Sequence, residues 1–217
     1  MRTDDGKLIV FEGIDGSGTT TQVDRYATYL RGRKRPVRVT REPSDGPIGV
    51  LLRLGLAGRL KIGASNQAQA MALLFAADRL DHLAHDIEPH LREGHVVLCD
   101  RYDLSSIAYQ TATARLEGEG PGEFENWVRS LNRYALRPDV TIVVDVTADE
   151  AERRRRERRG AVELYEEAQL QRRLAELYGE AERLVPGDKI LRIDGNQPTD
   201  QVATAIREAL APLVEGS

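Results

Sequence analysis

The chain carries its most informative segment near the N-terminus, at residues 7–22, where it reads KLIVFEGIDGSGTTTQ. The four consecutive apolar residues 8–11 predict a short strand that is buried on both faces. Glycines at positions 13, 16 and 18 indicate a tight turn, and a helix-compatible stretch begins at Thr19. A strand, a glycine turn and a helix together form a phosphate cradle, because backbone N–H groups and the positive end of the helix dipole attract an anion.

The glycine spacing matches the P-loop pattern G-x-x-x-x-G-K-[ST] at every position except the lysine, which is Thr19 here. The missing lysine removes one cation from the site of the β- and γ-phosphates, whereas Thr20 still offers a hydroxyl to Mg²⁺. A dinucleotide-binding G-x-G-x-x-G is excluded because position 21 is threonine. A glycine turn that only joins a strand to a helix remains the structural alternative. We expect ATP to be bound by Gly13, Asp15, Gly16, Ser17, Gly18, Thr19, Thr20 and Thr21.

Composition narrows the class of protein. With 217 residues, of which 41% are hydrophobic, the chain can bury one substantial core, so we expect a single domain over residues 1–217. The net charge of -4 gives no general affinity for nucleic acid. The single cysteine, Cys99, provides no disulfide framework and indicates a reducing compartment. No apolar signal segment or membrane-length run is present in the sequence, which favours a cytoplasmic protein without a membrane partner.

The remaining sequence alternates between strand and helix patterns. Further strands are expected at residues 37–40, 95–99, 140–146 and 190–193, and helices at residues 20–30, 68–83, from 103 onward, from 147 onward, 163–185 and 199–213. Residues 44–49 indicate a loop, and residues 111–138 are less readable, with Trp127 as core or as a subunit contact. Five strands alternating with helices predict a three-layer α/β/α fold with a five-stranded parallel sheet and helices on both faces.

Charged residues follow two of the expected strands directly. Arg41 and Glu42 come after the second strand, and Asp100 and Arg101 come after the third. The carboxyl ends of parallel strands share one edge of the sheet, where open α/β sheets bind ligands. Asp100 is therefore expected to hold Mg²⁺ together with Thr20, and Arg101 suits a second phosphate. The alternatives are an ordinary surface pair at Arg41 and Glu42, and a purely structural buried pair at Asp100 and Arg101.

Two other features have both a functional and a structural interpretation. Phe75 and Arg79 are four residues apart on one expected helix and are neighbours on its surface, either as core and surface charge or as a platform and donor for a base. Residues 153–159 contain six arginines, interrupted only by Glu157. Such a cluster in a net-acidic chain suggests an anion partner, because guanidinium groups suit phosphate oxygens, although a solvated charge run is the usual explanation.

These motifs occur together in an order that resembles the bacterial thymidylate kinases, which use ATP to phosphorylate dTMP to dTDP in dTTP biosynthesis. The resemblance rests on FEGIDGSGTTTQ (11–22), TREP (40–43), LLFAADR (73–79), DRYDLSSIAYQ (100–110) and the later arginine-rich segment. It implies a P-loop kinase fold, an arginine-rich lid around residues 150–166, Mg²⁺ as cofactor and ATP and dTMP as substrates. It also implies a homodimer built on helices such as that of Phe75.

The resemblance further implies a role for individual residues. Phe75 stacks on thymine, Arg79 donates to its carbonyl oxygen, and Tyr109 lies under the deoxyribose and disfavours a 2′-hydroxyl. The implied substrate-binding set is Glu12, Arg41, Phe75, Arg79, Arg101, Ser105, Ser106, Tyr109, Gln110, Tyr165 and Glu166. The implied catalytic set is Asp15, Arg101, Arg153, Arg156 and Arg159, and the metal is held by Thr20 and Asp100.

The absence of the P-loop lysine leaves two alternatives beside a working dTMP kinase. One is a nucleotide-binding protein of the same fold with negligible turnover, and the other is a kinase with altered donor or acceptor choice. If the chain is a kinase, the arginines of the lid have to supply the charge that Thr19 lacks.

Overall fold

The computed structural model describes residues 6–62, 66–116, 118, 122–159 and 165–214, and of these it leaves the side chains of 158, 159 and 165–168 undescribed. Five strands form one sheet in the order β2-β3-β1-β4-β5, and every neighbouring pair is parallel. The predicted five-stranded parallel sheet is therefore confirmed. The strands are β1 (Lys7–Glu12), β2 (Val37–Arg41), β3 (Val96–Asp100), β4 (Val140–Asp145) and β5 (Ile190–Asp194).

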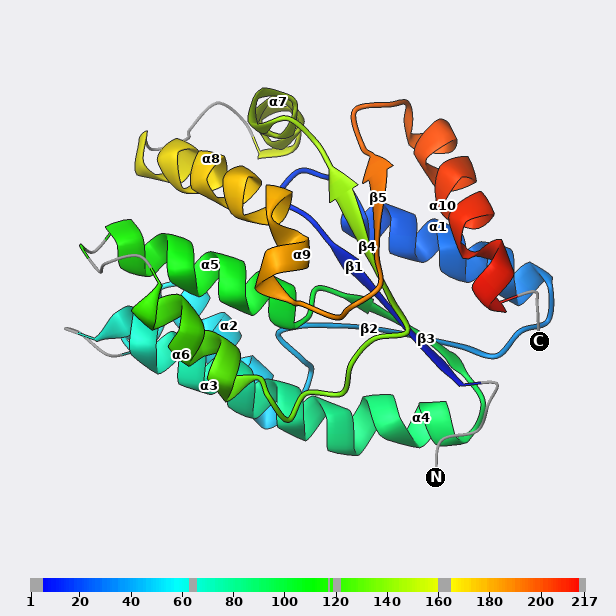
Figure 1. The fold of residues 1–217 in the computed structure, drawn as a ribbon, viewed down its shortest axis with the longest axis horizontal. Coiled ribbons are helices and arrows are strands. Elements are labelled where there is room, and N and C mark those ends of the chain that lie inside the picture. Colours follow the sequence, from blue (N-terminus) through cyan, green and yellow to red (C-terminus); the bar gives the residue numbers. More distant parts are fainter. Residues whose placement is uncertain (1–5, 63–65, 117, 119–121, 160–164, 215–217) are drawn as a thin grey trace.

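Helices cover both faces of this sheet (Figure 1). One face carries α1 (Thr19–Gly32) and α10 (Thr199–Val214), which pack against each other. The other face carries α3 (Gln67–His82), which continues through a π-helical turn (Leu83–Ile87) into α4 (Glu88–Arg92), together with α5 (Asp103–Leu116), α6 (Glu123–Leu131), α8 (Tyr165–Gly179) and α9 (Ala181–Leu184). α2 (Pro47–Leu56) packs on α3, and α7 (Ala148–Arg159) follows β4.

β1 is buried on both sides, which explains why its sequence is a continuous apolar run. Ile9 and Phe11 pack with the residues of α1 and α10, and Leu8 and Val10 pack with those of the π-helical turn and α4. Successive side chains of a strand point to opposite faces, so both layers depend on this one strand. The P-loop that follows β1 is thereby fixed at the centre of the sheet.

Two sequence predictions are corrected by the structure. Residues 44–49 were expected to be a loop, but α2 begins at Pro47, where proline suits the first helical position because it lacks an N–H that would need a partner. The helix expected over residues 163–185 is two helices, since α8 ends at Gly179, a poor helix former, and α9 begins at Ala181. Residues 163 and 164 lie outside the described part.

The segment that was hard to interpret, residues 111–138, contains the end of α5 and all of α6. Trp127 of α6 packs against Phe124 with ring centroids 5.4 Å apart, and both contact the core cluster between α5 and α8. Trp127 is therefore a core-facing residue. No helix in the described residues combines the length and the apolar character that crossing a membrane requires.

Candidate active site

The glycine-rich loop between β1 and α1 forms a concave surface at the carboxyl edge of the sheet. Gly16 and Gly18 both have a φ of 94°, a conformation that favours glycine, and Gly18 is the N-cap of α1. A Cβ on Gly16 would lie 2.5 Å from the carbonyl oxygen of Ala151 in α7, so helix and loop are in direct contact. A cavity of about 250 Å³ is lined by loop residues including Thr19 and Thr20, together with Arg101 and Arg155. Amide groups, a helix N-terminus and two guanidinium groups make this a site for an anion.

Thr20 and Asp100 form the pair that was expected to hold a metal. β1 and β3 pair with Phe11 opposite Asp100, which brings the carboxylate to the P-loop, and Thr20 Oγ1 donates to Asp100 Oδ2 at 2.5 Å. Asp100 Oδ1 is buried and has no hydrogen-bond partner among the described residues. Within the described part of the chain, no group of three or more His, Cys, Asp or Glu side chains is arranged so that it could hold a metal ion. A hydroxyl and one carboxylate fit Mg²⁺, which takes its remaining oxygens from phosphates and water.

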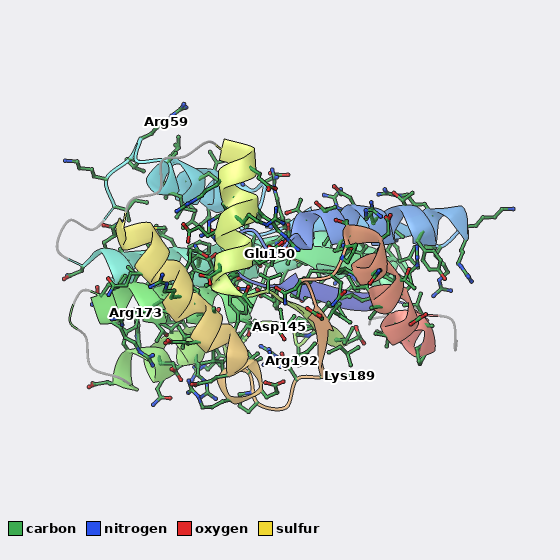
Figure 2. The ribbon with its side chains drawn as sticks, turned by 90° about the horizontal axis from the view of Figure 1, so that it is seen from above. Arg59, Asp145, Glu150, Arg173, Lys189 and Arg192 are labelled. Carbon is green, nitrogen blue, oxygen red and sulfur yellow. The ribbon has the colours of Figure 1, made fainter. Side chains whose placement is uncertain are left out.

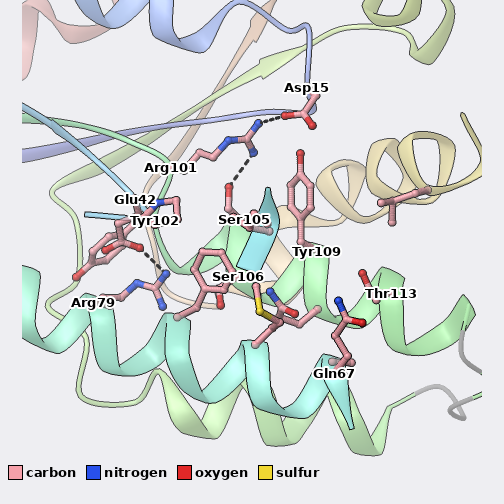
Figure 3. Close-up of a pocket in the computed structure, with 17 residues that line it drawn as sticks. Asp15, Glu42, Gln67, Arg79, Arg101, Tyr102, Ser105, Ser106, Tyr109 and Thr113 are labelled. Atoms are coloured by element: carbon pink, nitrogen blue, oxygen red, sulfur yellow. Dashed lines mark hydrogen bonds and ion pairs between the residues drawn. The ribbon is translucent and has the colours of Figure 1, made fainter. Parts of the chain in front are cut away.

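Arg101 joins the phosphate cavity to a second, larger one. Its Nη2 donates to Asp15 Oδ1 at 2.6 Å and its Nη1 donates to Ser105 Oγ at 3.2 Å (Figure 3). Nη1 also donates to the carbonyl oxygen of Gly13 at 3.1 Å. The guanidinium also lies 5.1 Å from the ring centroid of Tyr109. The residue has a φ of 70°, which is uncommon outside glycine, so these contacts offset a backbone cost.

The second cavity, of about 420 Å³, lies between α3, α5 and α8 (Figure 3). One wall is Phe75 and Met71 of α3, and the opposite wall is Tyr109 of α5. Ser106 Oγ is buried there without a hydrogen-bond partner in the described residues, so it is available to a ligand. The residues of the implied substrate set that line this cavity are Phe75, Arg79, Arg101, Ser105, Ser106, Tyr109 and Gln110, and Asp15 lines it as well.

Arg79 is not a surface charge, which was one of the two interpretations of its position. Its side chain is 1% exposed, and its Nη2 donates to Glu42 Oε2 at 2.5 Å while Nη1 donates to Asn132 Oδ1. Nε is buried and has no partner in the described residues, although the side chain lines the second cavity. Glu42 is equally buried, so the alternative of a surface pair at Arg41 and Glu42 is wrong.

Asp100 and Arg101 are not a structural pair either, because Asp100 bonds to Thr20 and Arg101 bonds to Asp15. Arg41 is exposed and lies 3.6 Å from Asp45, and it lines neither of the two cavities in the described structure. The side chains of Tyr165, Glu166 and Arg159 lie outside the described residues, and their implied roles stay predictions.

Glu12 was expected to bind substrate, and the structure places it beneath the site. Its carboxylate accepts hydrogen bonds from the backbone N–H groups of Tyr102 and Ser105 at 2.8 and 3.1 Å, from Ser105 Oγ at 2.5 Å and from the Tyr178 hydroxyl at 3.0 Å. Complete burial raises the pKa of Glu12 above its ordinary value, although the Ser105 hydroxyl and the charge of Arg101 act in the opposite direction. Glu12 thereby fixes the start of α5 and with it the cavity wall.

The arginines of α7 lie in different environments. Arg153 and Arg156 bond to carboxylates of their own helix, Arg153 to Glu150 and Glu157 and Arg156 to Glu152. The bonds from Arg153 and Arg154 lower the pKa of Glu150 to about 2. Figure 2, seen from above, shows α7 crossing between the α1 and α10 side and the α8 side of the molecule, with Glu150 labelled.

Two other arginines of α7 reach the P-loop. Arg154 donates to the carbonyl oxygens of Ser17 at 3.3 Å and Gly195 at 2.8 Å. Arg155 donates to the carbonyl oxygen of Asp15 at 2.6 Å. The resemblance implies Arg153, Arg156 and Arg159 instead, and a run of arginines does not show which of them faces the loop. The signal that was available is Ala151, whose small side chain marks the face against the loop and stands four residues before Arg155.

A third cavity, of about 540 Å³, lies on the far side of the loop from the second one. Its lining includes Gly18, Thr21, Arg153 and Arg154, and it extends to the start of α10 at Thr199. In the described structure the phosphate cavity therefore shares lining residues with each of the two large cavities, which share none with each other.

Comparison with known proteins agrees with this geometry. The sequence profile described as Thymidylate kinase matches residues 11–206. A protein of Pyrobaculum aerophilum named "Probable thymidylate kinase" is 39% identical over 208 residues, covering 95% of this chain and 97% of its own. Proteins of the same name are 38% identical in Pyrococcus horikoshii, over 86% of this chain and 87% of theirs, and 34% identical in Methanococcus maripaludis, over 96% and 99%. The motifs resembled the bacterial enzymes, whereas these three relatives are archaeal.

Proposed function

The chain belongs to the thymidylate kinase family, and on this premise we propose that it transfers the γ-phosphoryl group of ATP to dTMP, giving ADP and dTDP. The observation that carries the proposal is that Asp15 and Arg101 line both the phosphate cavity and the cavity between α3, α5 and α8. A nucleotide in the cavity between α3, α5 and α8 would therefore present its phosphate to the P-loop. This is the arrangement that transfer between two bound nucleotides requires.

The cavity between α3, α5 and α8 suits a thymine nucleotide. The Phe75 ring provides a face for stacking, and the unpartnered Ser106 Oγ and Arg79 Nε provide hydrogen-bonding groups for the edge of the base. The Tyr109 ring would lie under the sugar, where an apolar surface disfavours a 2′-hydroxyl. Asp15 accepts a hydrogen bond from Arg101 and lines the same cavity, so its carboxylate would face the sugar or the phosphate of this nucleotide.

In this proposal Arg101 binds the acceptor phosphate. The phosphate-binding role that the resemblance implies for Arg41, which lines neither cavity in the described structure, stays a prediction. An oxygen of this phosphate forms a bond to the γ-phosphorus, the bond from that phosphorus to the β–γ bridging oxygen breaks, and the electron pair stays on ADP. The acceptor is already anionic at neutral pH, so no general base is needed. Thr20 and Asp100 would hold Mg²⁺, which would supply positive charge to the β- and γ-phosphates.

A panel of nucleoside monophosphates tests this function. Purified protein with Mg²⁺ and ATP is expected to form ADP fastest with dTMP, and Thr19→Lys assayed beside it measures what the missing lysine costs. Binding of dTMP without turnover in the wild type, with activity gained in Thr19→Lys, would identify a nucleotide-binding protein instead. A clear preference for another monophosphate would identify a kinase of different specificity.

The wider organisation is part of the same proposal. We expect residues 1–217 to form one domain, in which the arginine-rich lid around residues 150–166 closes over bound ATP. A homodimer is supported by six exposed large hydrophobic residues on the neighbouring helices α2 and α3, namely Val50, Leu51, Leu54, Leu56, Leu73 and Leu80. The cytoplasmic location remains a prediction from the sequence.

A further inference from the structure

Thr19 occupies the position at which a P-loop has its lysine, and its side chain is only 6% exposed. It lines the phosphate cavity, so this cavity lacks the ammonium group that ordinarily reaches the β- and γ-phosphates. Among the described residues that line the cavity, the positively charged ones are Arg101 and Arg155. One of these two is the natural candidate to carry the missing charge.

Arg101 is committed to the acceptor side of the site. Its guanidinium is bonded to Asp15, Gly13 and Ser105, lies against the Tyr109 ring, and borders the cavity assigned to dTMP. Arg155 borders the phosphate cavity but not the dTMP cavity in the described structure. Both guanidinium groups bond to Asp15, Arg101 to its carboxylate and Arg155 to its backbone carbonyl oxygen. Because Arg155 does not line the dTMP cavity, we assign it to the donor side of the site.

The position of Arg155 is fixed by the way in which α7 packs on the loop. Ala151 is fully buried and its carbonyl oxygen meets Gly16, where a Cβ would not fit. Arg155 is one helical turn further on the same face, is 6% exposed, and donates from Nη1 to the carbonyl oxygen of Asp15 at 2.6 Å. Burial in this place holds the charge at the loop instead of in solvent.

The neighbouring arginines are placed differently. Arg153 and Arg156 are more than half exposed and bond to carboxylates of α7. Arg154 bonds to Ser17 and Gly195 and lines the third cavity, on the far side of the loop. Arg155 is thus the arginine of α7 that shares a cavity with Thr19 among the described residues.

We propose that the Arg155 guanidinium contacts the β- and γ-phosphates of ATP and supplies the charge that lysine supplies at the position of Thr19. The inference rests on the proposed kinase function and adds the residue that makes it possible. When the bond between the γ-phosphorus and the bridging oxygen breaks, negative charge accumulates on the ADP oxygens next to Arg155. The guanidinium stays protonated throughout, so it stabilises this charge without a proton transfer.

A double-mutant cycle between positions 19 and 155 tests this role. Arg155→Ala is expected to lower kcat by about 10²- to 10³-fold, with the KM for dTMP changed by less than about threefold, because the acceptor site is untouched. In the Thr19→Lys background the same substitution is expected to cost less than about tenfold, since lysine then provides the charge. Arg155→Lys should retain part of the activity. Arg92→Ala, at an exposed arginine of α4 that pairs with Glu88, is the matched control and should leave kcat unchanged.

Three results would overturn the inference. The first is an equal loss from Arg155→Ala with threonine and with lysine at position 19, which would mean that Arg155 only holds the loop in shape. The second is full activity of Arg155→Ala. The third is coupling to position 19 at Arg153 instead of Arg155. Thermal unfolding of every variant is measured first, and a variant that is not folded is replaced by Arg155→Gln.

A binding measurement separates this inference from the proposed function. Calorimetry with the β,γ-imido analogue of ATP and with ADP is expected to show that Arg155→Ala weakens the triphosphate more than the diphosphate. That result supports the role of Arg155 even if the wild type shows no turnover with dTMP. An absence of turnover would contradict only the proposed function. Turnover with dTMP and an unchanged ratio of the two affinities would sink only the inference.

Discussion

Glu12 is enclosed at the end of β1, and its environment determines how its charge affects stability. Since burial raises the pKa of Glu12 above its ordinary value of 4.5, the folded protein holds this proton more tightly than the unfolded chain does. The higher pKa in the folded state stabilises the fold fully below about pH 4.5, and this stabilisation is lost as the pH rises through the raised pKa. Glu12 is therefore a carboxylate that favours the folded state less at neutral pH than in acid.

Glu12→Gln removes this pH dependence. Glutamine is neutral at every pH and its amide can donate to Ser105 Oγ and the Tyr178 hydroxyl, so the Tm of the variant minus that of the wild type should become more positive from pH 4 to pH 8. Thermal unfolding at a series of pH values measures the difference. Glu208→Gln, at an exposed glutamate of α10, removes one charge without touching the buried site and serves as control. A difference that stays constant over this pH range would contradict the argument.

Gly16 is the residue through which the P-loop touches α7. Gly16→Ala would impose a side chain at a φ of 94° and a Cβ 2.5 Å from the carbonyl oxygen of Ala151. We expect a loss of about 1–2 kcal/mol from the conformation alone, and a fall in kcat of about 10²-fold because Arg155 moves with α7. Gly58→Ala is the matched control, with a φ of 67° and no heavy atom of the described structure within 4 Å of the new Cβ. Denaturant unfolding and the dTMP assay compare the two, and equal activities would refute the contact.

Several residues of the site were predictable because strand ends and glycine spacing place them. Thr20 and Asp100 were paired from the sequence, since one belongs to a P-loop pattern and the other follows a buried strand. Arg155 was not, because arginines at six of seven consecutive positions leave the orientation of the helix undetermined. The burial of Glu12 was not predicted either, because it depends on Tyr178, which is distant in sequence and contacts Glu12 only in the folded chain.

At the scale of elements, a buried ion pair joins α3 to the end of β2. Arg79→Met would leave Glu42 charged and enclosed, and we expect this to cost about 3–5 kcal/mol in the free energy of unfolding. The double variant Glu42→Gln with Arg79→Met should be more stable than the sum of the two single effects predicts, because the charges are removed together. Urea unfolding of the four proteins gives the coupling energy.

The exposed pair of Arg92 and Glu88 in α4 is the control for this cycle, with an expected coupling of only about 0.3–0.5 kcal/mol. Additive effects at Arg79 and Glu42 would show that the pair does not stabilise the fold. In that case Arg79 could leave Glu42 and bind a base without a loss in the stability of the fold.

The elements themselves were predicted best where burial is complete. β1 and β3 contain continuous apolar runs, and β4 is apolar apart from Thr141 and its last residue, because helices cover both of their faces. Each of the three was predicted from the sequence. α2 was missed because Gly46 and Pro47 suggest a turn, although the same two residues form a good helix start. The π-helical continuation of α3 into α4 has no signal in the local pattern.

At the scale of the molecule, the neighbouring helices α2 and α3 expose several large apolar residues, and this surface carries the proposed homodimer. Leu73 is 51% and Leu80 is 44% exposed, and because the two positions are seven apart both lie on one side of α3. Leu73→Asp is expected to shift the protein from dimer to monomer in analytical ultracentrifugation, with an unchanged circular dichroism spectrum. Tyr134→Ser, at a residue that is 69% exposed and lies outside these helices, should leave the molecular mass measured by sedimentation at that of the wild type. A wild type that sediments as a monomer would disprove the dimer.

The pairing of Phe11 with Asp100 has a consequence for how such a chain tolerates changes in length. Deleting one residue inside β3 would turn every later side chain of the strand to the opposite face, so that Arg101 would stand where the carboxylate of Asp100 now meets Thr20. Point substitutions in the strand leave that alignment alone. Apolar substitutions at the buried positions before Asp100 should therefore be tolerated better than any change in the length of β3, and insertions are expected in the connections between strands and helices.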